Sequence, residues 1–530
     1  MKQKVTRAVL GAALGTVLFA LWRETWFLTD DAHISFRYAR RLLAGEGLVW
    51  NLAPFAPVEG YSNFLWVLLL EAVWWLTGLA PPQSANALGL CSGWATLWVA
   101  WRFLEQREVP QSWTTARPFI ALAALLWVAT NCSFVTWLNS GLETGLYVFL
   151  VALWLTSTVR LGPEDDDARA LVSAAAASLA TLTRPDGMVL ALATAVVLGW
   201  RAVHKQRATA LWTLLLLLPV VGHFLFRYQA YGAWLPNTYY AKHLGPWPEA
   251  GVRYLGAYIL EYGLFAFLAV VLLAGAKGVQ YRQWPSFPGL VACSALLWQV
   301  GYLTLVVGGD HFEYRMLAPV AVPMALVAHN ALSLLQVGPN VAVSALLLMT
   351  VLGLPLPWLE HAATSAGALA PGIPTPFNSY VAKVDALKAW LWERDLAVRR
   401  REHVAVFRAQ DARFGPQVLF MPGAQEAPLV AAVNPPGVAG WNWPQVAIID
   451  LSGLNDFVIA RTPPPQTAKR RMAHDRQPPL GYVECFRPNL IEVAPGAWEF
   501  RPRPSRLEPQ DVQACETRFL KVVTESRLKP

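Results

Sequence analysis

The sequence predicts a polytopic α-helical membrane protein, with a water-facing α/β domain at its C-terminal end. Of its 530 residues, 55% are hydrophobic and only 15% are charged, whereas about a quarter of a soluble chain is charged. About eleven apolar runs could cross a hydrocarbon core of roughly 30 Å. Charge then becomes denser, because the residues after Trp358 hold 21 of the 43 Lys and Arg and 17 of the 35 Asp and Glu.

The eleven predicted crossings follow one another from the N-terminus. The first run has a basic start, so a cleavable signal peptide is the alternative, but no small-residue cleavage site precedes Trp22. The Trp-rich run 63–80 could also cross, and we expect it to lie on the membrane surface instead. The crossings are expected at roughly 5–22, 84–104, 118–138, 144–160, 170–183, 186–200, 209–228, 255–276, 287–307, 315–336 and 341–357.

Loop charge predicts the orientation. If 63–80 does not cross, five basic segments fall on one side, which the positive-inside rule assigns to the cytoplasm together with the N-terminus. An odd number of crossings then leaves the tail outside. The chain is thus expected to contain a transmembrane domain at 1–357, with a large first extracytoplasmic loop at 23–83, and an extracytoplasmic domain at 358–530. The basic segments are Lys2–Arg7, Arg102–Arg117, Arg160–Arg169, Arg201–Arg207 and Lys277–Arg282.

The runs 170–183 and 186–200 are separated by Arg184 and Pro185. Because proline cannot supply a helix hydrogen bond, the backbone is expected to break there, and a break at membrane depth is tolerated where it lines a cavity. One long kinked helix is the alternative. It would reverse every later loop and violate the charge rule.

The tail is expected to form a small mixed α/β module. VAKVDALKAWLWERDLAVRRRE reads as helical, and HVAVF, PQVLF and VAIID read as short strands. Cys485 and Cys515 could form a disulfide in an oxidising compartment, although spacing alone leaves this open. The module is expected to cap the mouth of the site and select the acceptor, with a stabilising lid as the alternative.

A pair of adjacent acids, Asp30 and Asp31, follows the first apolar run. A charged side chain at the membrane edge must form an ion pair, remain in contact with water or take part in function. The alternative is that the two acids are simply solvent-exposed residues at the end of a signal-anchor helix. Asp31 stands where the cap of a helix is expected. The other candidates for donor or acceptor binding on the same face are Arg37, Glu59, Tyr61, Asn63, Glu143, Arg184, Asp186, Asn237, Tyr239, Lys242, Asp310, His311 and Arg315.

These residue types suit one kind of chemistry. A carboxylate can deprotonate a hydroxyl group, and Arg or Lys can hold a phosphate leaving group, which fits sugar transfer from a lipid phosphate to an alcohol. There is no HExxH, CxxC, Walker A or dinucleotide-binding motif, so neither a metal nor another cofactor is expected. No basic stripe interleaved with aromatic residues occurs, so no nucleic-acid partner is expected.

An ordered set of motifs resembles a known family. DDAHISFRYARRLL, EGYSNFLW, NSGLET, LTRPDG, LPNTYYAK, GGDHFEYRMLAP, DLSGLNDFVIAR and MAHDRQPPLGYVECFRPN are similar to bacterial GT-C glycosyltransferases, above all to polyprenyl-phosphate-arabinose-dependent arabinofuranosyltransferases. The resemblance implies a polyprenyl-phosphate sugar donor, a glycan or glycoprotein acceptor and a bacterial plasma membrane. It also implies that a first-loop acid, Asp30 or Asp31, acts at the reaction centre. Of the two, Asp30 is the expected general base, because Asp31 stands where a helix cap is expected.

The same likeness implies roles for other residues. Glu143 and Arg184 would line the cavity, and Lys242 and Arg315 would bind the donor phosphate. The alternatives are a mannosyl- or other hexosyltransferase of the same superfamily, a transporter or flippase of lipid-linked sugars, and a membrane scaffold. No internal repeat is found and the polar clusters gather on one face, which disfavours the transporter.

Overall fold

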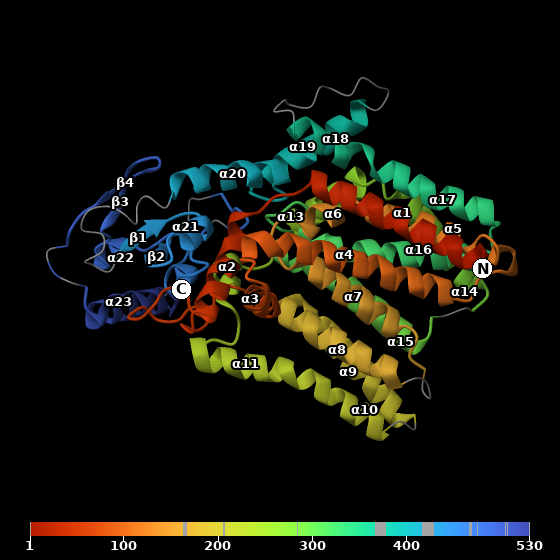
Figure 1. The fold of residues 1–530 in the computed structure, drawn as a ribbon, viewed down its shortest axis with the longest axis horizontal. Helices are drawn as coiled ribbons and strands as arrows, with labels where there is room; N and C mark the ends of the chain where they lie inside the picture. Colours follow the sequence, from red (N-terminus) through yellow and green to blue (C-terminus); the bar gives the residue numbers. More distant parts are fainter. Residues whose placement is uncertain are drawn as a thin grey trace. The chain divides into compact units, whose positions relative to one another are not determined.

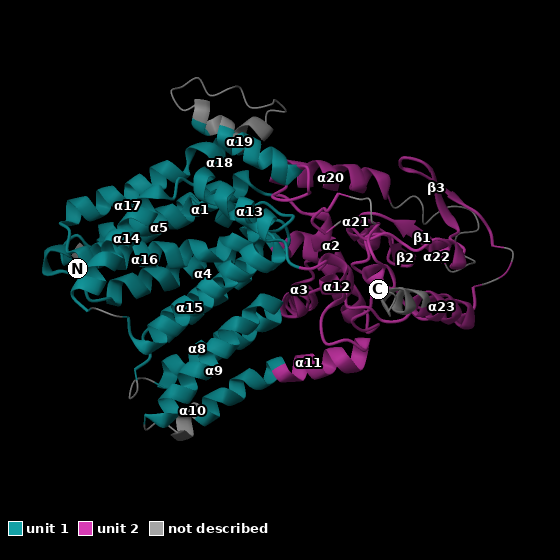
Figure 2. Cartoon of the chain, turned by 180° about the vertical axis from the view of Figure 1, so that it is seen from behind, with its two compact units in different colours: residues 1–26, 86–220, 246–392 teal, residues 27–85, 221–245, 393–530 magenta. Residues whose placement is uncertain are grey.

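The computed structural model describes residues 2–162, 167–204, 207–282, 285–365, 378–415, 429–465, 469–473, 475–503, 505 and 507–528. The chain is mostly helical (Figure 1) and divides into two compact units, each built from three segments (Figure 2). Unit 1 comprises 1–26, 86–220 and 246–392, and unit 2 comprises 27–85, 221–245 and 393–530. Most of the predicted first loop and the part of the predicted tail from residue 393 onward thus belong to one compact unit. The boundary expected at 357/358 remains a prediction.

Unit 1 is a bundle of apolar helices. Its elements are α1 (Lys2–Glu24), α4 (Pro81–Gln106, whose first turn belongs to unit 2), η1 (Gln111–Trp113), α5 (Arg117–Ala129), α6 (Cys132–Leu138), α7 (Thr144–Thr158), α8 (Asp167–Thr183), η2 (Pro185–Gly187), α9 (Met188–Val203), α10 (Arg207–Leu214), η3 (Leu215–Leu217), α13 (Pro248–Glu261), α14 (Phe265–Gln280), α15 (Phe287–Tyr302), η4 (Leu303–Val307), η5 (Arg315–Val320), α16 (Ala321–Leu335), α17 (Pro339–Gly353), α18 (Pro355–Ser365) and α19 (Asn378–Trp392).

Unit 2 combines short helices with two small sheets. Its elements are α2 (Asp30–Leu43), α3 (Phe64–Thr77), α12 (Asn237–Lys242), α20 (Arg400–Arg413), β1 (Val430–Val433), α21 (Gly437–Asn442), β2 (Ala447–Asp450), η7 (Ile459–Arg461), α22 (Tyr482–Cys485), β3 (Leu490–Ala494), β4 (Ala497–Phe500) and α23 (Pro509–Leu528). Helix α11 (Leu218–Tyr231) passes from unit 1 into unit 2.

The membrane prediction is confirmed in kind, but the count of eleven crossings is not. Within the described residues, six helices are long and apolar enough to span a membrane, or up to nine if three bent pairs each count as one span. Two predicted crossings are not straight helices. Run 118–138 is α5 and α6, bent by 66°, and run 255–276 is α13 and α14, bent by 99°. Glycine explains the second bend, since Gly263 between α13 and α14 has a φ of 55°.

The break at Arg184 and Pro185 is a hairpin, as predicted. Helix α8 ends at Thr183, the chain turns through η2, and α9 packs back against α8 (Figures 1 and 2). A Cβ on Gly187 would lie 2.5 Å from the carbonyl carbon of Ala180, so only glycine permits this close approach. The alternative of one long kinked helix is therefore excluded.

Basic loops meet at one end of unit 1, as the orientation argument expects. Arg7 at the start of α1 forms an ion pair of 2.8 Å with Glu105 near the end of α4. Arg160 after α7 donates to the carbonyl oxygen of Phe103 on α4, and Arg117 at the start of α5 donates to that of Glu105. The basic loops at these four helix ends thus lie together.

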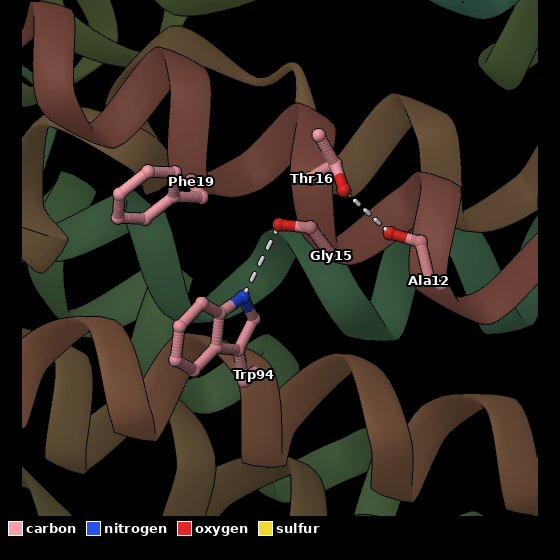
Figure 3. A pocket seen from close by; sticks show the side chains of 5 residues that line it. All are labelled: Ala12, Gly15, Thr16, Phe19 and Trp94. Carbon is pink, nitrogen blue, oxygen red and sulfur yellow. Dashed lines mark hydrogen bonds between the residues drawn. The ribbon is translucent and has the colours of Figure 1, made fainter.

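The first helix is packed into unit 1. The Trp94 indole on α4 donates to the carbonyl oxygen of Gly15 on α1 (3.3 Å), beside a surface groove of about 380 Å³ (Figure 3). The ring of Phe19 stacks on the same indole at 6.4 Å. This packing agrees with the interpretation of the first apolar run as a transmembrane helix.

The small sheets of unit 2 confirm a mixed α/β module but correct its parts. VAIID forms β2, which pairs in parallel with β1, while β3 and β4 pair antiparallel. The prediction of a strand at HVAVF is wrong, since these residues lie within α20, where His403 is the buried residue. The predicted strand PQVLF lies outside the described residues.

Candidate active-site residues

Asp30 is the first residue of α2, and its carboxylate is held in one orientation. It accepts hydrogen bonds from the backbone N–H groups of Gly437 (2.9 Å) and Val438 (2.8 Å), at the start of α21. The residue is only 7% exposed. Burial raises the pKa of Asp30 to about 7, and the adjacent charge of Asp31 adds to the increase. A carboxyl group with a pKa near neutrality can both lose and accept a proton at physiological pH.

The helix cap is not the one that the sequence suggested. The N-cap of α2 is Thr29, whose hydroxyl accepts from the N–H of Ala32 (3.3 Å). The expectation that Asp31 caps this helix is therefore wrong, because the helix begins two residues earlier than that expectation requires. Asp31 lies in the first turn and is half-buried.

Arg37, one turn and a half further along α2, is almost fully buried. Its Nε donates to the carbonyl of Trp50 (2.8 Å), and its other N–H groups have acceptors in unit 2, which are the carbonyls of Gly440, Trp443 and Val446 and the side chain of Asn51. All five donors are therefore used within the protein. Arg37 joins the first loop to α21 and its following loop, which is a structural role.

Three further candidates from the first loop are also buried in unit 2. Glu59 forms an ion pair of 2.6 Å with Arg227 on α11. The hydroxyl of Tyr61 lies 3.2 Å from that of Tyr231, and Asn63 exchanges hydrogen bonds with Ser35. These contacts hold the EGYSN segment against α2 and α11.

The LPNTYYAK motif forms the short helix α12, and its candidates differ in access. The Asn237 amide donates to the carbonyls of Gly453 (2.9 Å) and Leu454 (3.0 Å) and accepts from Arg461, so it anchors a loop. Tyr239 is 37% exposed and stacks on His243. Lys242, in the last turn, has neither an ion pair nor a side-chain hydrogen bond among the described residues and remains half-buried. Its ammonium group is available to an anion.

In unit 1 the structure brings three candidates together from separate motifs. Arg184 forms a bidentate pair with Asp186 (3.0 and 3.2 Å), and its Nη1 lies 3.8 Å from Glu143 Oε1. The guanidinium also lies over the ring of Tyr147 and contacts Met316. The turns NSGLET and LTRPDG and the start of η5 thus meet at one end of the bundle.

The GGDHFEYR loop is fixed to unit 1 mainly by its backbone. Side chains of α6 and α13 donate to three of its carbonyl groups, those of Tyr314, Glu313 and Phe312. Within the loop, Arg315 pairs with Asp310 (Nε to Oδ2, 3.1 Å) and lies over the ring of Phe312. His311 packs edge-on against the same ring. Arg315 is therefore already neutralised by a neighbour, unlike Lys242.

Sequence reasoning missed two residues that organise unit 2. Arg227, in the apolar run of α11, is the counter-ion of Glu59, and a lone Arg within such a run was a usable signal. Gly437 lies so close to Asp30 that a Cβ would stand 1.9 Å from the Asp30 carbonyl oxygen. No sequence signal pairs these two residues. In the part of the chain that the structure describes, no three His, Cys, Asp or Glu side chains are grouped to hold a metal.

Known proteins similar to this chain fall into two groups. No protein-family model matches it. The chain is 27% identical over 347 residues to the terminal β-(1→2)-arabinofuranosyltransferase of Corynebacterium glutamicum, covering 58% of this chain and 48% of that protein. It is 28% identical over 286 residues to the enzyme of the same name from Mycobacterium tuberculosis, covering 50% and 43%. The chain thus spans about half the length of the curated relatives it matches.

Solved structures reveal the fold. The crystal structure of ArnT from Cupriavidus metallidurans in the apo state matches with a TM-score of 0.55 and 16% identity, covering 86% of this chain and 88% of that one. The same protein bound to undecaprenyl phosphate matches with a TM-score of 0.53 and 15% identity, covering 85% and 87%. The chain has the GT-C fold. The chain is a multi-pass membrane protein in which most of the first loop and residues 393–530 belong to one compact unit.

Proposed function

We propose that this GT-C chain is a membrane glycosyltransferase that moves arabinofuranose from a polyprenyl-phosphate donor to an extracytoplasmic glycan or glycoprotein. The similarity to arabinofuranosyltransferases supports the sugar, and the undecaprenyl phosphate bound by ArnT supports the class of donor. The observation that carries the proposal is the oriented carboxylate of Asp30. The disulfide of unit 2 supports an extracytoplasmic tail.

The proposed reaction needs one base and one anion-binding group. Asp30 takes the proton of the acceptor hydroxyl while that oxygen forms a bond to the anomeric carbon of the sugar. The bond from this carbon to the phosphate oxygen breaks, and the polyprenyl phosphate leaves with the electron pair. Among the phosphate candidates, Lys242 is preferred to Arg315, since Arg315 already has Asp310 as a partner.

The preference for Asp30 over Asp31 rests on preorganisation. Two backbone N–H groups fix the Asp30 carboxylate, and a base held in one orientation loses little freedom in the transition state. Asp31 then acts as the neighbouring charge that helps to keep the pKa of Asp30 near 7. If Asp31 were the base, Asp30 would only hold α21.

The test uses the full chain in lipid nanodiscs, with polyprenyl-phosphate [¹⁴C]arabinose as donor and an arabinan oligosaccharide as acceptor. Covalent label in the oligosaccharide supports the enzyme. In a parallel assay with the chain in lipid vesicles, movement of intact donor across the bilayer without transfer would instead support a transporter. Faster transfer from polyprenyl-phosphate mannose would overturn the proposed sugar but not the reaction class.

Two amide variants test the base. Asp30→Asn is expected to lower kcat by about 100-fold or more, the usual contribution of a general base, and to remove the rise of kcat through an apparent pKa near 7. Asp31→Asn is expected to have a much smaller effect on kcat and to shift that apparent pKa downwards. The reverse ranking, with both variants folded, would assign the base to Asp31.

A further inference from the structure

Unit 2 contains a cavity of about 220 Å³ that the proposed reaction does not use. It lies between the first loop, the loop after β2 and the helices α22 and α23, which are neighbours in Figure 1. Its lining includes parts of two tail motifs, DLSGLNDF and LGYVECF, to which no role has yet been given. The side chains on which the argument rests are Phe55, Asp456, Phe457, Tyr482, Phe486 and Glu516.

One wall of the cavity is a loop fixed by buried carboxylates. The two carboxylate oxygens of Asp450 accept from the backbone N–H groups of Ser452 (2.9 Å) and Asn455 (2.8 Å). Asp456 Oδ1 accepts from Val458 N–H (2.9 Å), and its Oδ2 accepts from the Tyr482 hydroxyl (2.9 Å). The loop therefore has a defined shape before any ligand binds.

Another part of the lining, from α22 and α23, is held by a covalent bond. The disulfide of Cys485 and Cys515 links α22 to α23 across 5.9 Å between their Cα atoms. Cys485 directly precedes the cavity residue Phe486, and Cys515 directly precedes Glu516. The cross-link thus fixes an aromatic ring and a carboxylate on one wall.

The Glu516 carboxylate makes few hydrogen bonds within unit 2. Its Oε1 accepts a long hydrogen bond of 3.4 Å from the Ala56 N–H. Its other oxygen has no hydrogen-bond partner among the described residues. Burial raises the pKa of Glu516 above its usual range. A half-buried carboxylate with a spare oxygen in a cavity is suited to accept hydrogen bonds from a ligand.

The lining selects the class of ligand. Aromatic rings present apolar faces, while Glu516 and the Asp456–Tyr482 pair present oxygen atoms, and a sugar ring offers both C–H faces and hydroxyl donors. An anion such as a phosphate would be repelled by two carboxylates. The volume is below the roughly 300–1,000 Å³ of sites for drug-sized ligands, which suits one monosaccharide unit.

We propose that this cavity binds one sugar ring of the acceptor glycan, with its hydroxyl groups on Glu516 and its face on the aromatic wall. The inference rests on the proposed function, since it identifies that acceptor as a glycan. It gives the tail a part in choosing the acceptor. An enzyme that holds the acceptor at a second point can recognise the chain rather than only its terminal hydroxyl.

The experiment measures binding and transfer separately on the full chain in nanodiscs. Binding of an arabinan oligosaccharide, with no donor present, is followed by saturation-transfer NMR and titration calorimetry. Glu516→Gln is expected to raise the Kd about tenfold or more, the loss that follows removal of a charge-assisted hydrogen bond. In the transfer assay it raises the acceptor KM by the same factor and leaves kcat and the donor KM unchanged.

Two more variants keep the test decisive. Phe457→Leu removes an aromatic ring, which also lies under the guanidinium of Arg461 at 3.3 Å, and is expected to weaken oligosaccharide binding as well. Glu499→Gln changes an exposed acid on β4 in the same unit and should leave the Kd unchanged. Equal oligosaccharide affinity for wild type, Glu516→Gln and Phe457→Leu would overturn the inference. Binding of Ca²⁺, added as CaCl₂, in competition with the oligosaccharide would also overturn it. Binding without transfer would instead contradict the proposed function.

Discussion

Two buried arginines, one in each unit, are stabilised in opposite ways. Arg184 in unit 1 is 4% exposed and faces two carboxylates, Asp186 and Glu143. Arg37 in unit 2 is 1% exposed, and its hydrogen-bond acceptors are four backbone carbonyls and one amide. Opposite charges thus stabilise Arg184, whereas backbone and amide dipoles surround Arg37. The two arrangements should fail differently when they are mutated.

The largest expected effect is at Arg37. Arg37→Met would leave buried carbonyl acceptors without donors, and an orphaned buried polar group costs about 1–3 kcal/mol each. We expect unit 2 to lose at least about 4 kcal/mol and to become sensitive to proteolysis between α2 and α21. Limited proteolysis in nanodiscs with mass spectrometry would locate the opened segment. Arg501→Met, an exposed change directly after β4, is the control, and equal protection of the two variants would refute the dipole argument.

Removal of the Cys485–Cys515 disulfide is expected to have the next largest effect on stability. This disulfide also distinguishes unit 2 from unit 1. Cys485 and Cys515 in unit 2 form a disulfide, whereas Cys91, Cys132 and Cys293 in unit 1 are thiols outside any disulfide. Closing a loop with a sequence separation of 30 residues is worth about 3.5 kcal/mol in the chain-entropy description. Cys515→Ser should therefore lower the unfolding temperature of unit 2, as should a reductant. Cys293→Ser should have little effect, and a reductant response that survives in Cys515→Ser would contradict this account.

A pair of glycines compares the packing of the units at a smaller scale. A Cβ on Gly437 in α21 would lie 1.9 Å from the Asp30 carbonyl oxygen, while one on Gly256 in α13 of unit 1 would meet nothing within 4 Å. We expect Gly437→Ala to cost about 1–3 kcal/mol through overpacking and Gly256→Ala to be neutral or to stabilise by up to about 1 kcal/mol. Chemical denaturation of both variants checks this. Equal changes in the free energy of unfolding for the two variants would mean that α21 does not pack closely against Asp30.

The difference between the units also explains what the sequence could predict. Local composition predicts the apolar runs, the break at Pro185 and the grouping of basic loops. Each of these features is marked by residues at or near the ends of helices. The meeting of Glu143, Arg184 and Asp186 followed from the expected orientation, because all three residues end or begin helices at one face. Periodicity and loop charge are local signals, so they predict helices, helix breaks and the side of the membrane on which each loop lies.

Contacts across hundreds of residues gave no such signal. Asp30 meets Gly437 and Val438, and Arg37 meets Gly440, through backbone groups that every residue carries. Because every residue has a backbone carbonyl group, the sequence does not reveal which carbonyls accept hydrogen bonds from Arg37. A structural role for Arg37 could therefore not be distinguished from ligand binding on the basis of the sequence. HVAVF has the alternation of a strand, yet the polar residues around it favour a helix in which His403 is buried.

The smallest expected effect is a change in how stability depends on pH, and it isolates the Asp30 contact. Burial raises the pKa of Asp30 from 3.8 to about 7. Between these values the folded state binds more protons than the unfolded state, so the free energy of unfolding falls as pH rises from about 4 to 7. Asp456 and Glu59, whose pKa values burial also raises to about 7, act in the same direction.

His33 opposes them, because burial lowers its pKa to about 4, so its contribution is lost as pH falls below 6.5. Asp30→Asn removes one titrating group and should make the slope less negative by at most about 1.36 kcal/mol per pH unit. Denaturant unfolding of unit 2 at pH 5, 6 and 7 measures it, with Glu499→Gln as the control that keeps the wild-type slope. An unchanged slope in Asp30→Asn would mean that Asp30 is solvated in the folded state, which would also remove the oriented carboxylate on which the proposed general base depends.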